Sequence, residues 1–261
     1  MKKLFFVVSL ALSVLVGCKN APIDEQVSQF MDEVAKMNDD AAEAYQAITD
    51  EIEQDAFVEK FYDEMKDKCL SVIRKNKDNE LGLAAFKEVF QILDPEELES
   101  TVKMLGAKIS EDQFISSVKQ GIASKKATAE GCKFTDFEVD GVKFSDFVGK
   151  GKYVLVDFWA SWCGPCKREI PNIAAVYEKY HGEDFNVLSI AVWDKPEDTV
   201  KAAAEHGVVW DQIINAQKIP TDIYGIDGIP HIMLIGPDGT ILKRDLRGAD
   251  IEKAVSEALG R

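Results

Sequence analysis

Two cysteines three residues apart, Cys163 and Cys166, are the residues of this sequence best suited to chemistry. They follow a short apolar run, Tyr153 to Phe158, that is typical of a strand buried on both faces of a parallel sheet. A helix-forming segment comes next, so we expect Cys163 at a helix N-terminus, where backbone N–H groups and the helix dipole favour the thiolate. Cys166 falls on the same helical face, near enough to close a disulfide.

Two neighbouring residues bear on this thiol chemistry. Pro165 lies between the cysteines, where the first turn of a helix tolerates a missing N–H and the ring stiffens the loop. Asp157 is an acid within the apolar run. A carboxyl buried there has a raised pKa and accepts the proton of Cys166 when that thiol attacks. The alternative is an aspartate at a strand end that reaches water and takes no part in the reaction.

The segment VDFWASWCGPCK, residues 156–167, resembles the active-site segment of thioredoxins. The flanking sequence, from about Ala129 to Arg261, is most similar to membrane-tethered thioredoxin-like reductases of the TlpA/ResA group. The resemblance implies an α/β thioredoxin-like domain with a central mixed sheet flanked by helices. It also implies a thiol-disulfide oxidoreductase whose redox-active group is the disulfide of its two active-site cysteines, with no separate cofactor and no metal.

The resemblance assigns roles to individual residues. Cys163 is the nucleophile and the more exposed of the pair, while Cys166 resolves the mixed disulfide by attacking it. The acid at Asp157 matches one that thioredoxins carry. Pro230 matches the proline that is cis in the thioredoxin fold, which puts the backbone of Ile229 beside the sulfurs, where an extended substrate segment pairs with it. The expected substrate contacts are Trp162, Gly164, Pro165, Ile229 and Pro230.

Several other interpretations compete with an exchanging dithiol. A static disulfide or half of a zinc site would also use the cysteine pair, but one CxxC supplies two ligands and the three histidines show no companion spacing. A peroxidase of the related fold would need its reactive cysteine in a Pro/Thr context, which CGPC does not provide. Trp159 either flanks the site or packs in the core. The dipeptide between the cysteines and the residue before Pro230 resemble reducing thioredoxins, so we expect reduction of protein disulfides.

The start of the chain predicts export. Residues 1–17 are typical of a signal peptide, with two lysines before an apolar run too short to span a bilayer. The end of this stretch resembles a bacterial lipobox, so we expect a lipid on Cys18 and a lipidated tether over residues 18–24. The alternative is ordinary secretory cleavage with an incidental Cys18. The expected protein is a lipoprotein of the bacterial cell envelope, facing the periplasm, with the lipid bilayer and an upstream membrane electron donor as partners.

Residues 25–127 have a helical pattern throughout and predict an all-helical domain of four to six helices. Its stripe of Met and Phe is typical of a core, with a binding groove as the alternative. If such a groove captures a partner, the protein is an adaptor whose redox pair is regulatory. Cys69 lies on this stripe and is expected to be a buried inert thiol, unless it forms a disulfide with Cys132. The formal net charge of −15 argues against nucleic acid as a partner.

Residues 128–261 predict the thioredoxin-like domain. Strand, helix, strand, helix and hairpin follow one another in the order that this α/β sheet requires. We expect a hairpin over 134–139 and 142–144, strands over 185–192, 210–214, 232–235 and 240–243, and helices over 196–206 and 249–259.

Overall fold

The computed structural model describes residues 21–261, so the expected signal peptide and Cys18 lie outside the described residues. The chain divides into two compact units, of which the first ends at Ser116 and the second runs from Ser117 to Arg261. Helix α6, Gln113–Ala127, is continuous across this division. None of the described helices has the length and apolar character that a membrane crossing requires.

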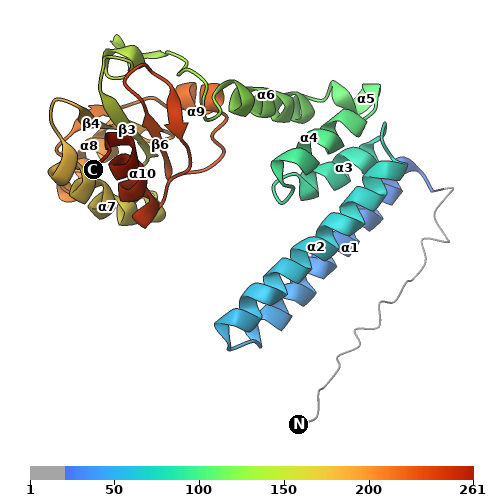
Figure 1. The fold of residues 1–261 in the computed structure, drawn as a ribbon. Helices are drawn as coiled ribbons and strands as arrows, with labels where there is room; N and C mark the ends of the chain where they lie inside the picture. The colour runs from blue at the N-terminus through green and yellow to red at the C-terminus, as the bar shows by residue number, and fades with distance from the viewer. Residues whose placement is uncertain (1–20) are drawn as a thin grey trace. The chain divides into compact units, whose positions relative to one another are not determined.

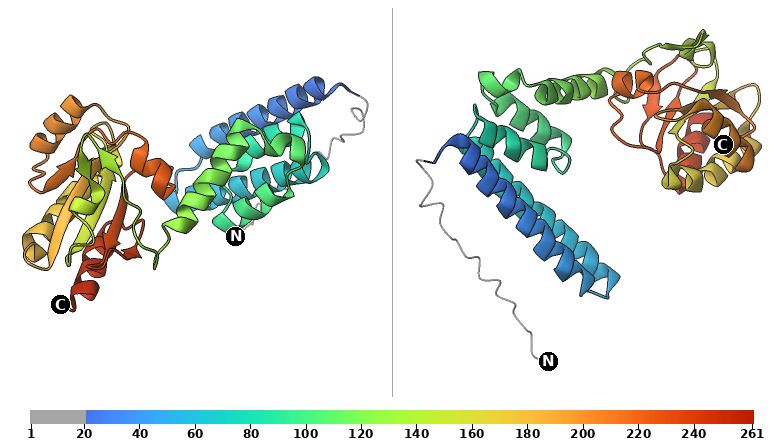
Figure 2. Two further views of the ribbon diagram at one scale, coloured as in Figure 1. Left: turned by 90° about the horizontal axis from the view of Figure 1, so that it is seen from above. Right: turned by 180° about the vertical axis from the view of Figure 1, so that it is seen from behind.

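In its described part, the first unit consists of helices joined by short connections. Helices α1 and α2 lie side by side along their length (Figure 2), and the buried residues of the two include Val34, Met65 and Cys69. The apolar stripe expected from the sequence therefore forms a core. Together with α6, the helix count falls within the expected four to six for this part of the chain. The elements are α1 Ile23–Gln46, α2 Glu51–Lys75, α3 Glu80–Val89, α4 Pro95–Met104 and α5 Ala107–Ser110.

The second unit is built on a five-stranded mixed sheet with β3 at its centre (Figure 1). Strands β4 and β5 run parallel to β3, whereas β6 is antiparallel to it and β7 is antiparallel to β6. The mixed sheet expected from the resemblance is therefore confirmed. The strand order is β5 Asp211–Ile213, β4 Phe185–Ala191, β3 Tyr153–Trp159, β6 His231–Ile235 and β7 Ile241–Lys243.

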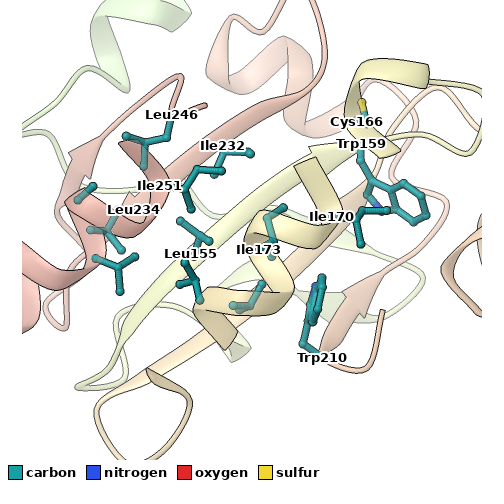
Figure 3. Packing of buried hydrophobic residues seen from close by; sticks show 14 of the residues in the cluster. Leu155, Trp159, Cys166, Ile170, Ile173, Trp210, Ile232, Leu234, Leu246 and Ile251 are labelled. Atoms are coloured by element: carbon teal, nitrogen blue, oxygen red, sulfur yellow. The ribbon is translucent and has the colours of Figure 1, made fainter. Parts of the chain in front are cut away.

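Side chains alternate between the two faces of this sheet, because successive residues of a strand point to opposite sides. One core contains Leu155 and Trp159 of β3, together with Cys166 and residues of helices α7, Gly164–Tyr180, and α10, Ala249–Leu259 (Figure 3). Asp157 lies between Leu155 and Trp159, so it faces the same side. Helix α8, Pro196–Glu205, also adds two alanines to this core.

The opposite core contains the alternate β3 residues Val156 and Phe158. It is covered by a hairpin and two short helices, of which the two helices were not predicted. The hairpin turns at Asp140 and Gly141, which both have positive φ. The covering elements are β1 Glu138–Val139, β2 Val142–Lys143, the 3-10 helix η1 Phe144–Asp146 and α9 Ile219–Tyr224.

Candidate active site

The two cysteines form a disulfide at the N-terminus of α7, with their Cα atoms 5.3 Å apart. Cys163 is the N-cap of this helix, and the backbone N–H of Cys166 donates to its Sγ at 3.1 Å. Gly164 and Pro165 make the first turn, where the proline needs no N–H. The strand-to-helix junction expected from the sequence is confirmed, and it aims the backbone N–H of Cys166 at the sulfur of Cys163.

The exposure of the two cysteines differs less than the sequence led us to expect. Cys163 is 3% exposed and Cys166 is 2% exposed in this oxidised form, so neither is distinctly the more accessible. The closed disulfide ties both sulfurs to the end of β3 and the first turn of α7, which equalises their burial. By contrast, Trp162, the residue before the pair, is 60% exposed.

The Ile229–Pro230 peptide bond is cis, as expected from the resemblance. The carbonyl oxygen of Ile229 lies 3.7 Å from Sγ of Cys163, which confirms that this backbone lies beside the disulfide. The guanidinium of Arg247 donates a hydrogen bond to the carbonyl of Pro230 and forms an ion pair with Asp245 at 2.9 Å. These contacts tie the loop before β6 to the segment between β7 and α10.

Asp157 is buried, with 2% of its surface exposed, so the alternative of an aspartate that reaches water is wrong. Burial raises the pKa of its carboxyl to about 7; the hydrogen bond from Ser189 and the charge of Arg247 oppose this shift, and the charge of Glu169 adds to it. Oδ2 accepts from the hydroxyl of Ser189 at 3.3 Å. Oδ1 has no hydrogen-bond partner among the described residues. This arrangement places a buried carboxyl with a raised pKa on the sheet face that α7 covers.

Comparisons with known proteins agree with this geometry. Residues 126–244 match the family model described as the AhpC/TSA family. The thiol-disulfide oxidoreductase ResA of Geobacillus kaustophilus is 30% identical over 122 residues, which cover 45% of this chain and 69% of that protein. The chain belongs to the thioredoxin-like thiol-disulfide oxidoreductases of the TlpA/ResA group. The family expected from the segment VDFWASWCGPCK is therefore confirmed.

Further relatives resemble the same part of this oxidoreductase. The ResA of Bacillus subtilis is 26% identical over 126 residues, which cover 46% of this chain and 69% of that protein. The thioredoxin domain of a thiol-disulfide oxidoreductase from Bacteroides vulgatus is 32% identical, with a TM-score of 0.43, and the match covers 50% of this chain and 95% of that one. A thiol:disulfide interchange protein from Bacteroides sp. is 32% identical, with a TM-score of 0.46 and coverages of 52% and 93%.

One carboxylate of the oxidoreductase site was missed by the sequence analysis. Asp194 accepts from both the backbone N–H and the hydroxyl of Ser161, at 2.6 and 2.9 Å, and from the hydroxyl of Thr199 at 2.9 Å. The neighbouring carbonyl of Trp193 accepts from the indole N–H of Trp162 at 2.9 Å. These bonds fix the turn that carries Trp162 and the disulfide. The sequence signal for Asp194 is its place between a buried strand and the proline that begins α8.

The remaining candidates of the oxidoreductase are structural. Trp159 is buried in the core, and its indole N–H has no hydrogen-bond partner among the described residues. Cys69 is a free cysteine buried in the helical unit, and Cys132 is a free cysteine of the second unit. Burial raises the pKa of Cys69 to about 11, which keeps it a thiol at neutral pH. Cys69 therefore behaves as the buried inert thiol that the apolar stripe predicts.

Proposed function

We propose that this oxidoreductase reduces disulfides of exported proteins by dithiol exchange, while a lipid on Cys18 holds it at the bacterial cell envelope. The observation that carries the exchange is the pair Cys163 and Cys166 at the N-terminus of α7, with the carbonyl of Ile229 beside Cys163. A static structural disulfide would need neither a helix N-terminal donor to Cys163 nor a backbone carbonyl beside it.

In the first step, the thiolate of reduced Cys163 attacks one sulfur of a substrate disulfide. A bond forms between Sγ of Cys163 and that sulfur, the substrate S–S bond breaks, and the other substrate sulfur leaves as a thiolate. The N–H of Cys166 and the dipole of α7 stabilise the attacking thiolate. Trp162 and the backbone at Ile229 and Pro230 orient the substrate segment, and the lack of side-chain bulk at Gly164 gives it room.

In the second step, the thiol of Cys166 transfers its proton to Asp157 and attacks Sγ of Cys163. The intramolecular disulfide closes and the bound substrate sulfur departs as a thiolate, so the substrate gains two electrons and the protein dithiol loses two. The burial of Asp157, the raised pKa of its carboxyl and its unpartnered Oδ1 support this role. An upstream membrane electron donor then reduces the disulfide again.

Insulin reduction by the full chain tests the proposal. We expect Cys163→Ser to abolish the activity, because no nucleophile remains, and Cys166→Ser to accumulate a mixed disulfide at Cys163. A redox titration measures the direction, since reducing thioredoxins lie near about −270 mV and strongly oxidising enzymes near about −120 mV. A potential near the oxidising end would contradict reduction as the direction and leave the enzyme class in place.

Fractionation of bacterial cells that express the protein tests whether a lipid on Cys18 anchors it. Lipid on Cys18 should hold the protein in the membrane fraction, and Cys18→Ser should release it to the soluble fraction of the envelope. If the protein is exported without a lipid, the natural protein and Cys18→Ser should both be found in the soluble fraction. Globomycin, which blocks lipoprotein signal cleavage, adds a second measurement, because it should retain the precursor of the natural chain only.

The helical unit supports a second candidate function, that of an adaptor. An adaptor would capture its partner on this unit, whose exposed residues include Tyr45, Ile52 and Tyr62, and use the redox pair as a switch. Insulin reduction distinguishes the two candidates, because an adaptor predicts that neither the full chain nor the isolated second unit reduces insulin.

A further inference from the structure

A chain of hydrogen bonds leads from Asp157 through two buried side chains that the dithiol mechanism does not use. The hydroxyl of Ser189 donates to Oδ2 of Asp157 at 3.3 Å. The indole N–H of Trp210 donates to Oγ of Ser189 at 2.9 Å. All three residues are buried, so each bond is formed away from solvent. A polar pair in this position of an otherwise apolar core needs a reason beyond packing.

The chemistry of these groups sets the direction of the bonds. An indole N–H donates and has no acceptor atom, so Oγ of Ser189 must accept from Trp210. The single proton of Ser189 is then left for Asp157, whose ionised carboxylate accepts only. Donation by Trp210 also polarises the hydroxyl and strengthens its own donation to the carboxylate. Trp210 thus orients Ser189, and Ser189 orients Asp157.

The relay, as we call the hydrogen-bonded Asp157, Ser189 and Trp210, lies on the sheet face whose core also contains Cys166. Asp157 on β3 and Ser189 on β4 are register partners, and both point to the sheet face that α7 covers. Trp210 lies just before β5 and packs in the same core as Ile170 and Ile173 of α7 (Figure 3). Because α7 also carries the resolving cysteine, the relay is positioned between the sheet and the helix that must supply the proton.

We infer that Ser189 and Trp210 are positioning residues that hold Asp157 ready to take the proton of Cys166. The inference rests on the proposed role of Asp157 as the proton acceptor. The hydroxyl of Ser189 occupies Oδ2 and stabilises the ionised carboxylate, which leaves the unpartnered Oδ1 for the incoming proton. The proton moves from Sγ of Cys166 to Oδ1 of Asp157, and Ser189 and Trp210 neither gain nor lose a proton.

The charged groups that act on Asp157 are Glu169 of α7, which opposes its ionisation, and Arg247 before α10, which favours it. The variants below leave both charges in place. A change in the pKa of Asp157 in these variants therefore comes from the loss of the hydrogen bonds made by Ser189 and Trp210. Ser189→Ala removes the hydroxyl, and Trp210→Phe keeps an aromatic ring while removing the N–H.

The second exchange step can be followed with Ellman's reagent. In a chain that also carries Cys18→Ser and Cys132→Ser, reduced Cys163 takes up thionitrobenzoate, and attack by Cys166 releases it as a coloured thiolate. The rate of this second phase should rise with pH as Asp157 ionises. We expect Ser189→Ala to shift the midpoint of this pH dependence upward by about one pH unit, because the carboxylate of Asp157 loses a hydrogen-bond donor. Trp210→Phe should give a smaller upward shift, and Ser189→Thr should keep the natural midpoint.

Trp159→Phe is the matched control for Trp210→Phe. It makes the same change in the same core, but its indole N–H has no partner to lose, so the midpoint should stay in place. In the double variant, Trp210→Phe should add no further shift to Ser189→Ala, since the relay is already broken. A ¹³C NMR titration of the Asp157 carboxyl should show the same shifts without any exchange reaction.

The outcomes separate the inference from the function on which it rests. Asp157→Asn should slow the second phase about a hundredfold; an unchanged rate would show that the proposed role of Asp157 fails. Asp157→Asn could slow the second phase while Ser189→Ala and Trp210→Phe keep the pH midpoint of the natural protein. This result would contradict the positioning role of Ser189 and Trp210 and leave the exchange mechanism in place. An equal shift in Trp159→Phe would also overturn it, because core disturbance alone would then explain the effect. If Ser189→Ala does not fold, the comparison of Trp210→Phe with Trp159→Phe still decides.

Discussion

At the scale of single residues, the function that we propose for Asp157 opposes the stability of the fold. Its carboxyl is buried beneath α7, and burial raises its pKa from 3.8 to about 7. An ionised carboxylate in this core costs free energy that an asparagine would not. Asp194 is the contrasting case, because its buried carboxylate accepts several hydrogen bonds and fixes the active-site turn.

Asp157→Asn should therefore stabilise the oxidised protein at high pH. The pKa of the acid is higher in the folded state than in the unfolded chain, so the natural protein loses stability as pH rises from about 4 to about 7. Asparagine does not titrate, and its advantage should grow over this window to about 4 kcal/mol above pH 7. Urea denaturation at pH 4.5 and pH 8 measures the difference. An advantage that is the same at both pH values would show that Asp157 does not titrate in this range.

At the scale of elements, the contact of α6 with α9 anchors the start of the second unit. Gly225 ends α9 with a φ of +61°, and an added Cβ would lie 2.6 Å from Cγ of Lys125 and 2.7 Å from the carbonyl oxygen of Gly121. Arg244 joins α9 to the residue that follows α6, because it donates to the carbonyls of Thr128 and Tyr224 at 2.6 and 2.8 Å. Glycine is required here both by the backbone conformation and by the close approach.

Gly225→Ala should lower the free energy of unfolding by about 2 to 4 kcal/mol, from left-handed backbone strain together with the clash against α6. Gly121→Ala is the matched control on the other side of the contact. Its Cβ would meet nothing within 4 Å, and alanine favours a helix interior, so this change should be neutral or slightly stabilising. Urea denaturation of both variants measures the difference. Equal stability of the two would contradict a tight contact between α6 and α9.

At the scale of the whole molecule, the dithiol chemistry belongs to the second unit. Every candidate site residue within residues 21–261 lies after Ser117, from Asp157 to Pro230. The unit also includes the last part of α6, which Thr128 and Lys125 tie to α9 and the segment after it. A fragment with the complete unit should therefore fold and exchange disulfides by itself.

The fragment Ser117–Arg261 should reduce insulin within about twofold of the full chain, because its sheet and active-site contacts are all retained. The shorter fragment Ala129–Arg261 loses Lys125 and Thr128, and it should unfold at lower urea concentration. Insulin turbidity and urea denaturation of the two fragments check both expectations. A folded Ser117 fragment without activity would show that the helical unit takes part in the exchange.

The sequence by itself determined the reactive pair, its place where a strand meets a helix, and the order of strands and helices around it. Such features depend on residues close together in the chain, which is why Cys163, Cys166 and helix α10 could be predicted. Only the tertiary structure decided the partners of Asp157 and Ser161, because Ser189 lies on the neighbouring strand β4 and Asp194 in the segment that follows it. Strand register and packing bring these distant residues together, and no local spacing encodes that pairing.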